Sequence, residues 1–282
     1  MLYYLRYIIS RCASAMGRCG KMHDFQKANI WKRISAAFLD IVLVVMVAVL
    51  IAWVIFTALG QQEYSAKLDA KNAEYAEKYG LVPTEEKPYL RMDPTTEEYE
   101  KFTDEEKKAL EDAYLALNND AEALRLLEML LSMTLLTMTF SILISQLIFE
   151  FIIPLILKNG QTIGKKVFGI GVMREDGVKV TAPLMFIRAL LGKYTIETMI
   201  PLYLFILIQF GLMGIVAYAI IALVLITQVV AVIATRTHSA IHDKFSRTVT
   251  VDFQSQKIFD TVEQMLEYKQ KIHSELAERS DY

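Results

Sequence analysis

The sequence predicts an all-α polytopic membrane protein with about four transmembrane helices, an extracytoplasmic helical hairpin insertion and a small cytoplasmic β element. Apolar residues make up 54% of its 282 residues, whereas an ordinary soluble domain has about 45–50%. They gather in blocks long enough to cross a bilayer as helices, which takes about 20 residues each. A long acidic segment separates the first two blocks, so the chain divides into membrane spans and one polar insertion.

Residues 1–28 precede the first apolar block and are expected in the cytoplasm. They mix basic and apolar residues without the uninterrupted apolar core of a signal peptide. Two interpretations stay open: a short amphipathic surface helix, or an upstream extension with translation starting at Met22 rather than Met1. The two cysteines, Cys12 and Cys19, both lie here, so no disulfide framework is available to the polar insertion.

The first transmembrane helix is predicted over residues 29–60. After Arg33, Asp40 is the one charged residue before Gly60. A carboxylate inside the hydrocarbon costs roughly 2.5–3.5 kcal/mol on insertion scales. Asp40 therefore needs either a polar partner or a functional role.

The acidic segment at 61–128 is predicted to be an extracytoplasmic insertion of two helices around a proline-containing turn. Its first helix is expected to stop at Gly80, a residue suited to the left-handed position after a helix. Thr103 and Glu106 have the spacing of a capping box, which predicts the start of the second helix. We expect this second helix to continue without interruption into the next span, and the insertion to be a candidate surface for an extracytoplasmic partner.

The second transmembrane helix is predicted over residues 129–157, with Glu150 as its one charged residue. The loop at 158–194 carries 7 Lys/Arg against 2 Asp/Glu and is expected in the cytoplasm. Within it, residues 166–181 have the pattern of a β-hairpin, which we predict to pair with a strand at 247–253. An amphipathic connector on the membrane surface is expected to complete the loop.

Residues 195–235 are predicted to form the third and fourth transmembrane helices. The 38 residues from Thr198 to Thr235 carry no charge. One helix of this length would be about 57 Å long at 1.5 Å per residue, whereas a bilayer core is about 30 Å thick. Two spans that turn near residues 211–214 fit better, and one strongly tilted or kinked helix is the weaker alternative. Residues 236–282 are expected to form a cytoplasmic strand and helical tail.

The distribution of basic residues predicts an orientation. The chain up to Arg33 carries 7 Lys/Arg and 1 acidic residue, and the 158–194 loop has a similar excess. Positively charged loops remain on the cytoplasmic side, so both are expected inside. Four spans then return the C-terminus to the cytoplasm, which predicts a multi-pass cell-membrane protein with both termini cytoplasmic and 61–128 outside.

Three acidic residues near the cytoplasmic ends of the spans could form an ion- or proton-binding level. Asp40 and Glu150 are expected at similar depth, about 10 Å from the cytoplasmic edge, with Glu197 nearer that edge. Such a group could bind a cation or share a proton. The alternative is that these acids pair with basic residues, among them Arg33 and Arg188, and hold the bundle together. Asp243 is the candidate partner of Arg33 at the cytoplasmic end.

No motif in the sequence indicates an enzyme, a cofactor or a nucleic-acid-binding module. His238 and His242 have a spacing that can hold a metal on a helix, but no second cluster completes a site, so no metal is expected. Glycines surround Lys165 and Lys166 without the Gly-Lys-Ser/Thr ending of a phosphate loop. The expected partners are the lipid bilayer, the unknown partner of 61–128 and, because the chain is small for a transporter, further copies of itself.

Three segments together resemble the RDD family of bacterial membrane proteins, namely WKRISAAFLD, NGQTIGKKVFGIGVMREDG and SAIHDKFSRTVTVD. The family is named for an arginine and two aspartates, and Arg33, Asp40 and Asp243 match them. The resemblance covers about 22–60 and 129–253, so the insertion departs from compact members. It implies a small cation/proton or solute transporter, since sodium/proton exchange has been suggested for some members. The alternative is a non-transporting scaffold, assembly or sensing protein whose outer helices bind a partner.

Overall fold

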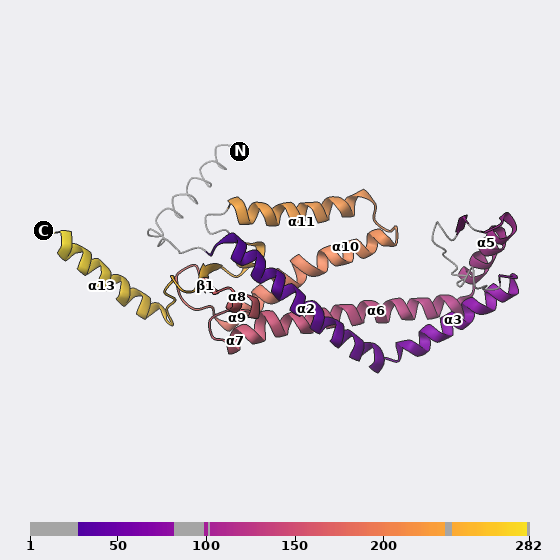
Figure 1. Ribbon diagram of the computed structural model, residues 1–282, viewed down its shortest axis with the longest axis horizontal. Helices are drawn as coiled ribbons and strands as arrows, with labels where there is room; N and C mark the ends of the chain where they lie inside the picture. Colours follow the sequence, from indigo (N-terminus) through magenta and orange to yellow (C-terminus); the bar gives the residue numbers. More distant parts are fainter. Residues whose placement is uncertain (1–27, 82–98, 101, 235–238, 281–282) are drawn as a thin grey trace, which may run out of the picture. The chain divides into compact units, whose positions relative to one another are not determined.

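The computed structural model describes residues 28–81, 99–100, 102–234 and 239–280 (Figure 1). The predictions for Met22, for the proline-containing turn of the insertion and for His238 lie outside these residues. By internal packing the chain divides into two units, one of residues 1–45 and 144–282 and one of residues 46–143.

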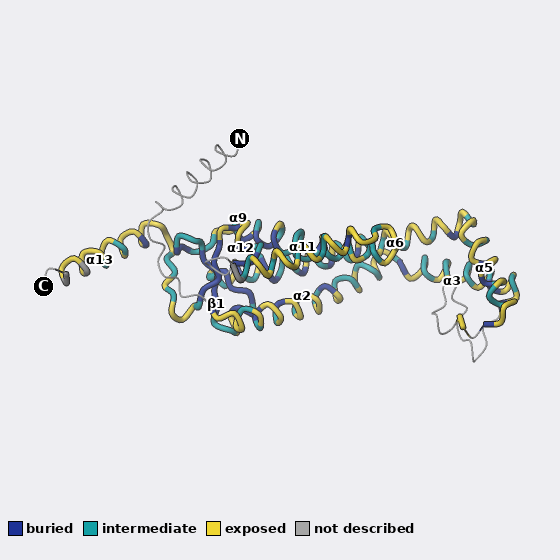
Figure 2. Tube along the Cα trace, turned by 90° about the horizontal axis from the view of Figure 1, so that it is seen from above, coloured by how far each residue is buried: buried dark blue, intermediate teal, exposed yellow. Residues whose placement is uncertain are grey.

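Four helices among the described residues are long and apolar enough to cross a membrane, which confirms the predicted fold class. They are α2 (Ile30–Ala58); α6 (Ala121–Leu147) continued by η1 (Ile148–Ile152) and α7 (Ile153–Ile156); α9 (Ala182–Ile187) continued by η2 (Arg188–Met199) and α10 (Ile200–Gln209); and α11 (Ile215–Ala234). Large apolar side chains stay exposed along them, for example Phe38 at 69% and Trp53 at 67%. The exposed stretches are yellow in Figure 2. Such surfaces are stable when they face lipid.

The third span differs from the prediction at its beginning. Its helix starts at Ala182, so the segment expected to lie on the membrane surface is helical and continues directly into the third span. Two π-helical segments, η1 and η2, interrupt the α-helical geometry of the second and third spans. π-helices are rare in proteins, and those that occur are often found at functional sites. The third and fourth spans turn where predicted, with Gly211 at φ 67° in the connection.

The insertion contains α3 (Gln61–Lys78) and α5 (Asp104–Asn118), which pack on each other. Their shared core consists of Ala76, Leu81, Phe102, Leu110 and Ala113. The predicted helix signals are present: Gly80 has φ 71° after α3, and the capping box of Thr103 and Glu106 starts α5.

The prediction that the second polar helix continues into the next span was wrong. The helix breaks at Asn119 and Asp120, between α5 and α6. Asn119 caps the end of α5, and the Asp120 carboxylate accepts a hydrogen bond of 2.8 Å from the backbone N–H of Glu122 at the start of α6. Side chains that bond the backbone locally favour helix ends, so these two neighbouring residues end one helix and start the next.

The predicted β element is a two-stranded antiparallel sheet of β1 (Ile170–Arg174) and β2 (Thr248–Asp252), which confirms the pairing of these two segments. The second half of the expected hairpin at 166–181 forms only isolated bridges, one of them between Met173 and Lys179, rather than a strand. Val172 pairs with Thr250 in its register, and the tight turn after β1 is closed by the Gly177 N–H on the Arg174 carbonyl at 3.0 Å. Two short helices flank the sheet, α8 (Ile163–Val167) before β1 and α12 (Ile241–Phe245) before β2. Buried residues gather around β1 and α12 (Figure 2). The helical tail is α13 (Val262–Ser280).

Candidate functional site

Asp40 is 2% exposed and holds helix α8 against α2. One carboxylate oxygen accepts a hydrogen bond from the Thr162 hydroxyl at 2.5 Å, and the other accepts from the Gly164 N–H at 2.8 Å. A side chain on Gly164 would not fit, because an added Cβ would lie 2.3 Å from the Ala36 carbonyl oxygen. Asp40 thus bonds both groups at the start of a helix whose backbone lies directly on the span.

Asp243, at the start of α12, is fully buried and forms ion pairs with two arginines from different spans. Arg33 of α2 lies 3.4 Å from Asp243 Oδ2, which is the pairing suggested by the sequence. The Nε of Arg188 donates to Oδ1 at 3.1 Å. The Thr248 hydroxyl reaches the same oxygen at 3.4 Å. Asp243 therefore connects α2, η2 and β2.

Glu150, 3% exposed in η1, is surrounded by cationic side chains. Lys193 donates a hydrogen bond to Oε1. On the other oxygen, Oε2, Arg188 Nη1 lies 3.7 Å away and Lys165 Nζ lies 4.0 Å away. Asp40 and Glu150 thus have separate sets of partners.

Glu197 contacts His242, with 2.7 Å between Oε1 and Nδ1. The same oxygen accepts from the backbone N–H of His242 at 3.3 Å, and Gln228 accepts from the N–H of Ile241 at 3.0 Å. These bonds fix the start of α12 to the third and fourth spans. Gly192 permits the close approach, because an added Cβ there would lie 2.4 Å from the His242 Cβ.

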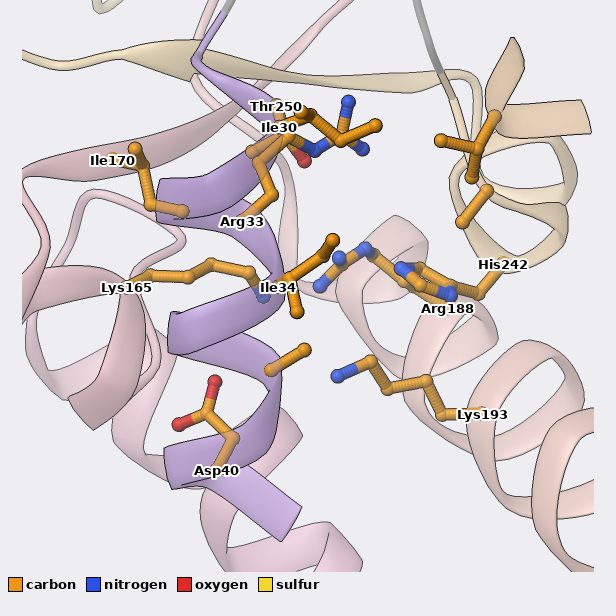
Figure 3. Close-up of a pocket in the computed structure, with 13 residues that line it drawn as sticks. Ile30, Arg33, Ile34, Asp40, Lys165, Ile170, Arg188, Lys193, His242 and Thr250 are labelled. Carbon is orange, nitrogen blue, oxygen red and sulfur yellow. The ribbon is translucent and has the colours of Figure 1, made fainter. Parts of the chain in front are cut away.

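A cavity of about 180 Å³ lies among these groups (Figure 3). Figure 3 shows Lys165 entering from one side and Arg188 and Lys193 from the other, with their nitrogen atoms directed toward one another. The cavity is lined by Ile30, Arg33, Ile34, Ala37, Asp40, Lys165, Ile170, Arg188, Lys193, Val232, Ala240, His242 and Thr250. Charged side chains and apolar ones thus line the same small, partly open space.

Burial and neighbouring charges shift the pKa of three groups outside the spans, namely Lys165, His242 and Asp243. It lowers the pKa of Lys165 to about 7, further helped by Arg188 and opposed by Glu150. Burial likewise lowers the pKa of His242 below its usual 6.5, against the attraction of Asp243. For Asp243, burial alone would raise the pKa, but His242 and the two arginines outweigh it and hold the pKa well below 3.8.

Several buried polar atoms near the cavity have no hydrogen-bond partner among the described residues. They are Lys165 Nζ, both terminal nitrogens of Arg188 and Glu150 Oε2. Arg188 Nη2 does lie 3.1 Å from Asp243 Oδ1, but without the geometry of a hydrogen bond. Unsatisfied buried donors are costly, so a water, an ion or a ligand is expected to occupy the space beside them.

The predicted site residues thus lie in one charged cluster, but Asp40, Glu150 and Glu197 each contact different partners within it. The residues that the sequence did not indicate are Lys165, Thr162 and Gly164, which lie in or at the start of helix α8, before β1. The glycines around Lys165 and Lys166 indicate that this segment packs closely on another element. Nothing in the local sequence indicates which span that element is. No group of three or more His, Cys, Asp or Glu residues suited to a metal occurs in the part of the chain that the structure describes.

Comparison with known proteins gives one match. The sequence profile of the RDD family matches residues 27–247, which include the four spans, strand β1 and every residue of the charged cluster. No curated protein and no solved structure matches the chain. Since the matched segment covers most of the sequence, the protein belongs to the RDD family of membrane proteins.

Proposed function

We propose that this protein is a small transporter of a polar solute or ion, with the charged cavity as its solute site. The observation that carries the proposal is the cavity of about 180 Å³, lined by charged side chains of α2, α8 and η2. Buried charges cost several kcal/mol each, and well-packed apolar residues would often hold a bundle equally well. Charged side chains in membrane spans therefore favour a role in binding a solute or an ion.

The contacts of the acidic residues favour some roles over others. A cation at Glu150 would have to displace Lys193 and would meet the charges of Lys165 and Arg188. Asp40 already accepts two hydrogen bonds from the protein. The two carboxylates are thus better suited to ordering the basic side chains around a solute. That they bind a cation directly stays a prediction, tested by the flux measurement below.

The contact between Glu197 and His242 supports a role in proton transfer more directly than the contacts of Asp40 and Glu150 support cation binding. Glu197 and His242 lie 2.7 Å apart, and both belong to elements that border the cavity. A carboxylate and an imidazole at this distance can share one proton. In this proposal the pair handles a proton, while the cavity holds the solute.

The orientation belongs to the proposal as well. An excess of basic residues in the segments before α2 and between the second and third spans supports cytoplasmic termini and an extracytoplasmic 61–128 insertion. The cavity would then open near the cytoplasmic face. A homo-oligomer in the membrane would supply the further helices that so small a bundle needs for a transport path.

The test is flux through proteoliposomes of the purified protein, with sodium, proton and phosphate gradients applied in separate assays. Wild-type protein should carry at least one of them, and Asp40→Asn and Glu150→Gln should each lower that flux about tenfold or more, the effect of about 1.4 kcal/mol. Glu128→Gln is the matched control, since Glu128 is exposed on α6. All variants must elute as folded, monodisperse protein and be inserted.

A non-transporting scaffold is the second candidate, supported by the insertion. Helices α3 and α5 have a core of their own and belong to a segment, 61–128, in which acidic residues outnumber basic ones, features that suit a partner-binding module. Absence of flux in the wild type, combined with lower thermal stability of Asp40→Asn and Glu150→Gln, would reject the transporter and favour this alternative.

A further inference from the structure

The charged residues that line the cavity are mainly cationic. Arg33, Lys165, Arg188 and Lys193 line it against one carboxylate, Asp40, among the described residues. Both oxygens of that carboxylate are already bonded to the start of α8. Glu150 and Asp243 balance the basic charges but are not among the lining residues. The charge that a solute would meet among the apolar lining residues is therefore mainly positive.

The lining residues also offer hydrogen-bond donors that the protein does not use. Arg188 is 1% exposed and Lys165 is 7% exposed, yet Lys165 Nζ and both terminal nitrogens of Arg188 lack a hydrogen-bond acceptor among the described residues. An arginine fork matches two oxygens of one phosphate or carboxylate group, and a lysine adds a third donor. The nitrogen atoms that lack a hydrogen-bond acceptor are thus of the kind that recognises an oxyanion.

The size and the apolar part of the lining narrow the class of ligand. Pockets for drug-sized ligands have about 300–1,000 Å³, so a cavity of about 180 Å³ suits a smaller group. Ile30, Ile34 and Val232 form part of its wall. Apolar walls lower the local dielectric and strengthen the attraction between the basic side chains and an anion.

We propose that the cavity binds a small oxyanion, a phosphate or carboxylate group, between Arg188, Lys165 and Lys193. This inference rests on the proposed function in taking the cavity as the solute site, and it names the class of solute. The oxyanion can come from a free ion such as inorganic phosphate or from the headgroup of an anionic lipid, since both present the same oxygens to the same donors.

Equilibrium binding tests the proposal without any gradient. The full chain, delipidated in a non-ionic detergent, is dialysed against radiolabelled inorganic phosphate at pH 7, and in a second arm is titrated with short-chain phosphatidylglycerol. We expect saturable binding with one ligand per chain in at least one arm. Binding should be about tenfold weaker or more in Lys165→Gln, as loss of one charged hydrogen bond implies.

Two variants separate the site from general charge effects. Lys166→Gln removes the same charge from an exposed neighbour and should bind as the wild type does. Lys165→Gln leaves the hydrogen bonds of Asp40 intact, because Lys165 Nζ takes no part in them. Binding in the phosphate arm identifies a free ion as a ligand, and binding in the lipid arm alone identifies a headgroup.

The proposal is overturned if neither ligand binds, or if Lys165→Gln and Lys166→Gln bind equally well. Its failure is distinct from failure of the transporter. Phosphate binding without flux would reject transport and keep the oxyanion site. Sodium or proton flux without binding in either arm would keep the transporter and reject the oxyanion.

Discussion

At the scale of single residues, Arg33, Asp40 and Asp243, the residues that the resemblance singled out, form two separate sets of contacts. Asp40 bonds the start of α8, whereas Arg33 and Asp243 form an ion pair that Arg188 joins. The pairing of Arg33 with Asp243 could be predicted, because both residues were expected at the cytoplasmic end of the bundle. The partners of Asp40 could not, because Thr162 lies 122 positions away and nothing local indicates the contact.

Asp243 should be the most sensitive of these residues to substitution. Asp243→Asn removes the buried negative charge that Arg33 and Arg188 share, so we expect thermal unfolding to show a loss of about 3–5 kcal/mol. Arg33→Gln should cost less, because Arg188 still compensates Asp243. Lys32→Gln is the control, since its pair with Asp252 at 2.9 Å is 44% and 21% exposed and should contribute about 0–1 kcal/mol. Equal losses for Asp243→Asn and Lys32→Gln would contradict the buried network.

Lys165 should make the stability depend on pH. Its pKa is about 7 in the folded protein and 10.5 when exposed, so between these values the unfolded chain binds more protons. The free energy of unfolding therefore increases through this group as the pH rises from about 7 toward 10, and it decreases again as the pH falls. In ligand-free protein, the difference in melting temperature between wild type and Lys165→Gln should change across this range in that direction. A constant difference would show that Lys165 titrates as an exposed lysine.

At the scale of elements, glycines decide which helices can touch. Gly164 lets α8 lie on α2, and Gly192 lets η2 lie on α12. The helix ends at Gly60 and Gly80 could be predicted, because each is a local choice of a left-handed residue. The close approaches at Gly164 and Gly192 could not be predicted, since they depend on a second element that the local sequence does not identify.

Gly164→Ala should separate α8 from α2. The new Cβ would lie 2.3 Å from the Ala36 carbonyl oxygen, so α8 must move and Asp40 loses its backbone donor. We expect a loss of about 1–3 kcal/mol in thermal unfolding, the cost of a buried charge left without one hydrogen bond. Gly214→Ala is the matched control, because nothing lies within 4 Å of a Cβ there. A destabilisation no larger than that of the control would place α8 away from the span.

At the scale of the whole molecule, four spans, the short sheet and the polar insertion could be predicted from hydropathy, alternation and charge. The break between α5 and α6 and the early start of the third span could not. In the first case two cap residues ended a helix whose apolar spacing continued. In the second, the charges of Arg188 and Lys193 indicated a separate surface segment, because their partners Asp243 and Glu150 come from other parts of the chain.

The central claim is that the charged cavity is open to water, and cysteine accessibility tests it most directly. In a background with Cys12 and Cys19 replaced by serine, Ala37→Cys adds a thiol to the cavity lining. Phe38→Cys adds one at nearly the same depth on the exposed apolar face. We predict that a membrane-impermeant, negatively charged thiosulfonate modifies Ala37→Cys from the cytoplasmic side and leaves Phe38→Cys unmodified. A thiol at position 37 that is unreactive from both sides would mean a dry, purely structural charge cluster and would contradict the account.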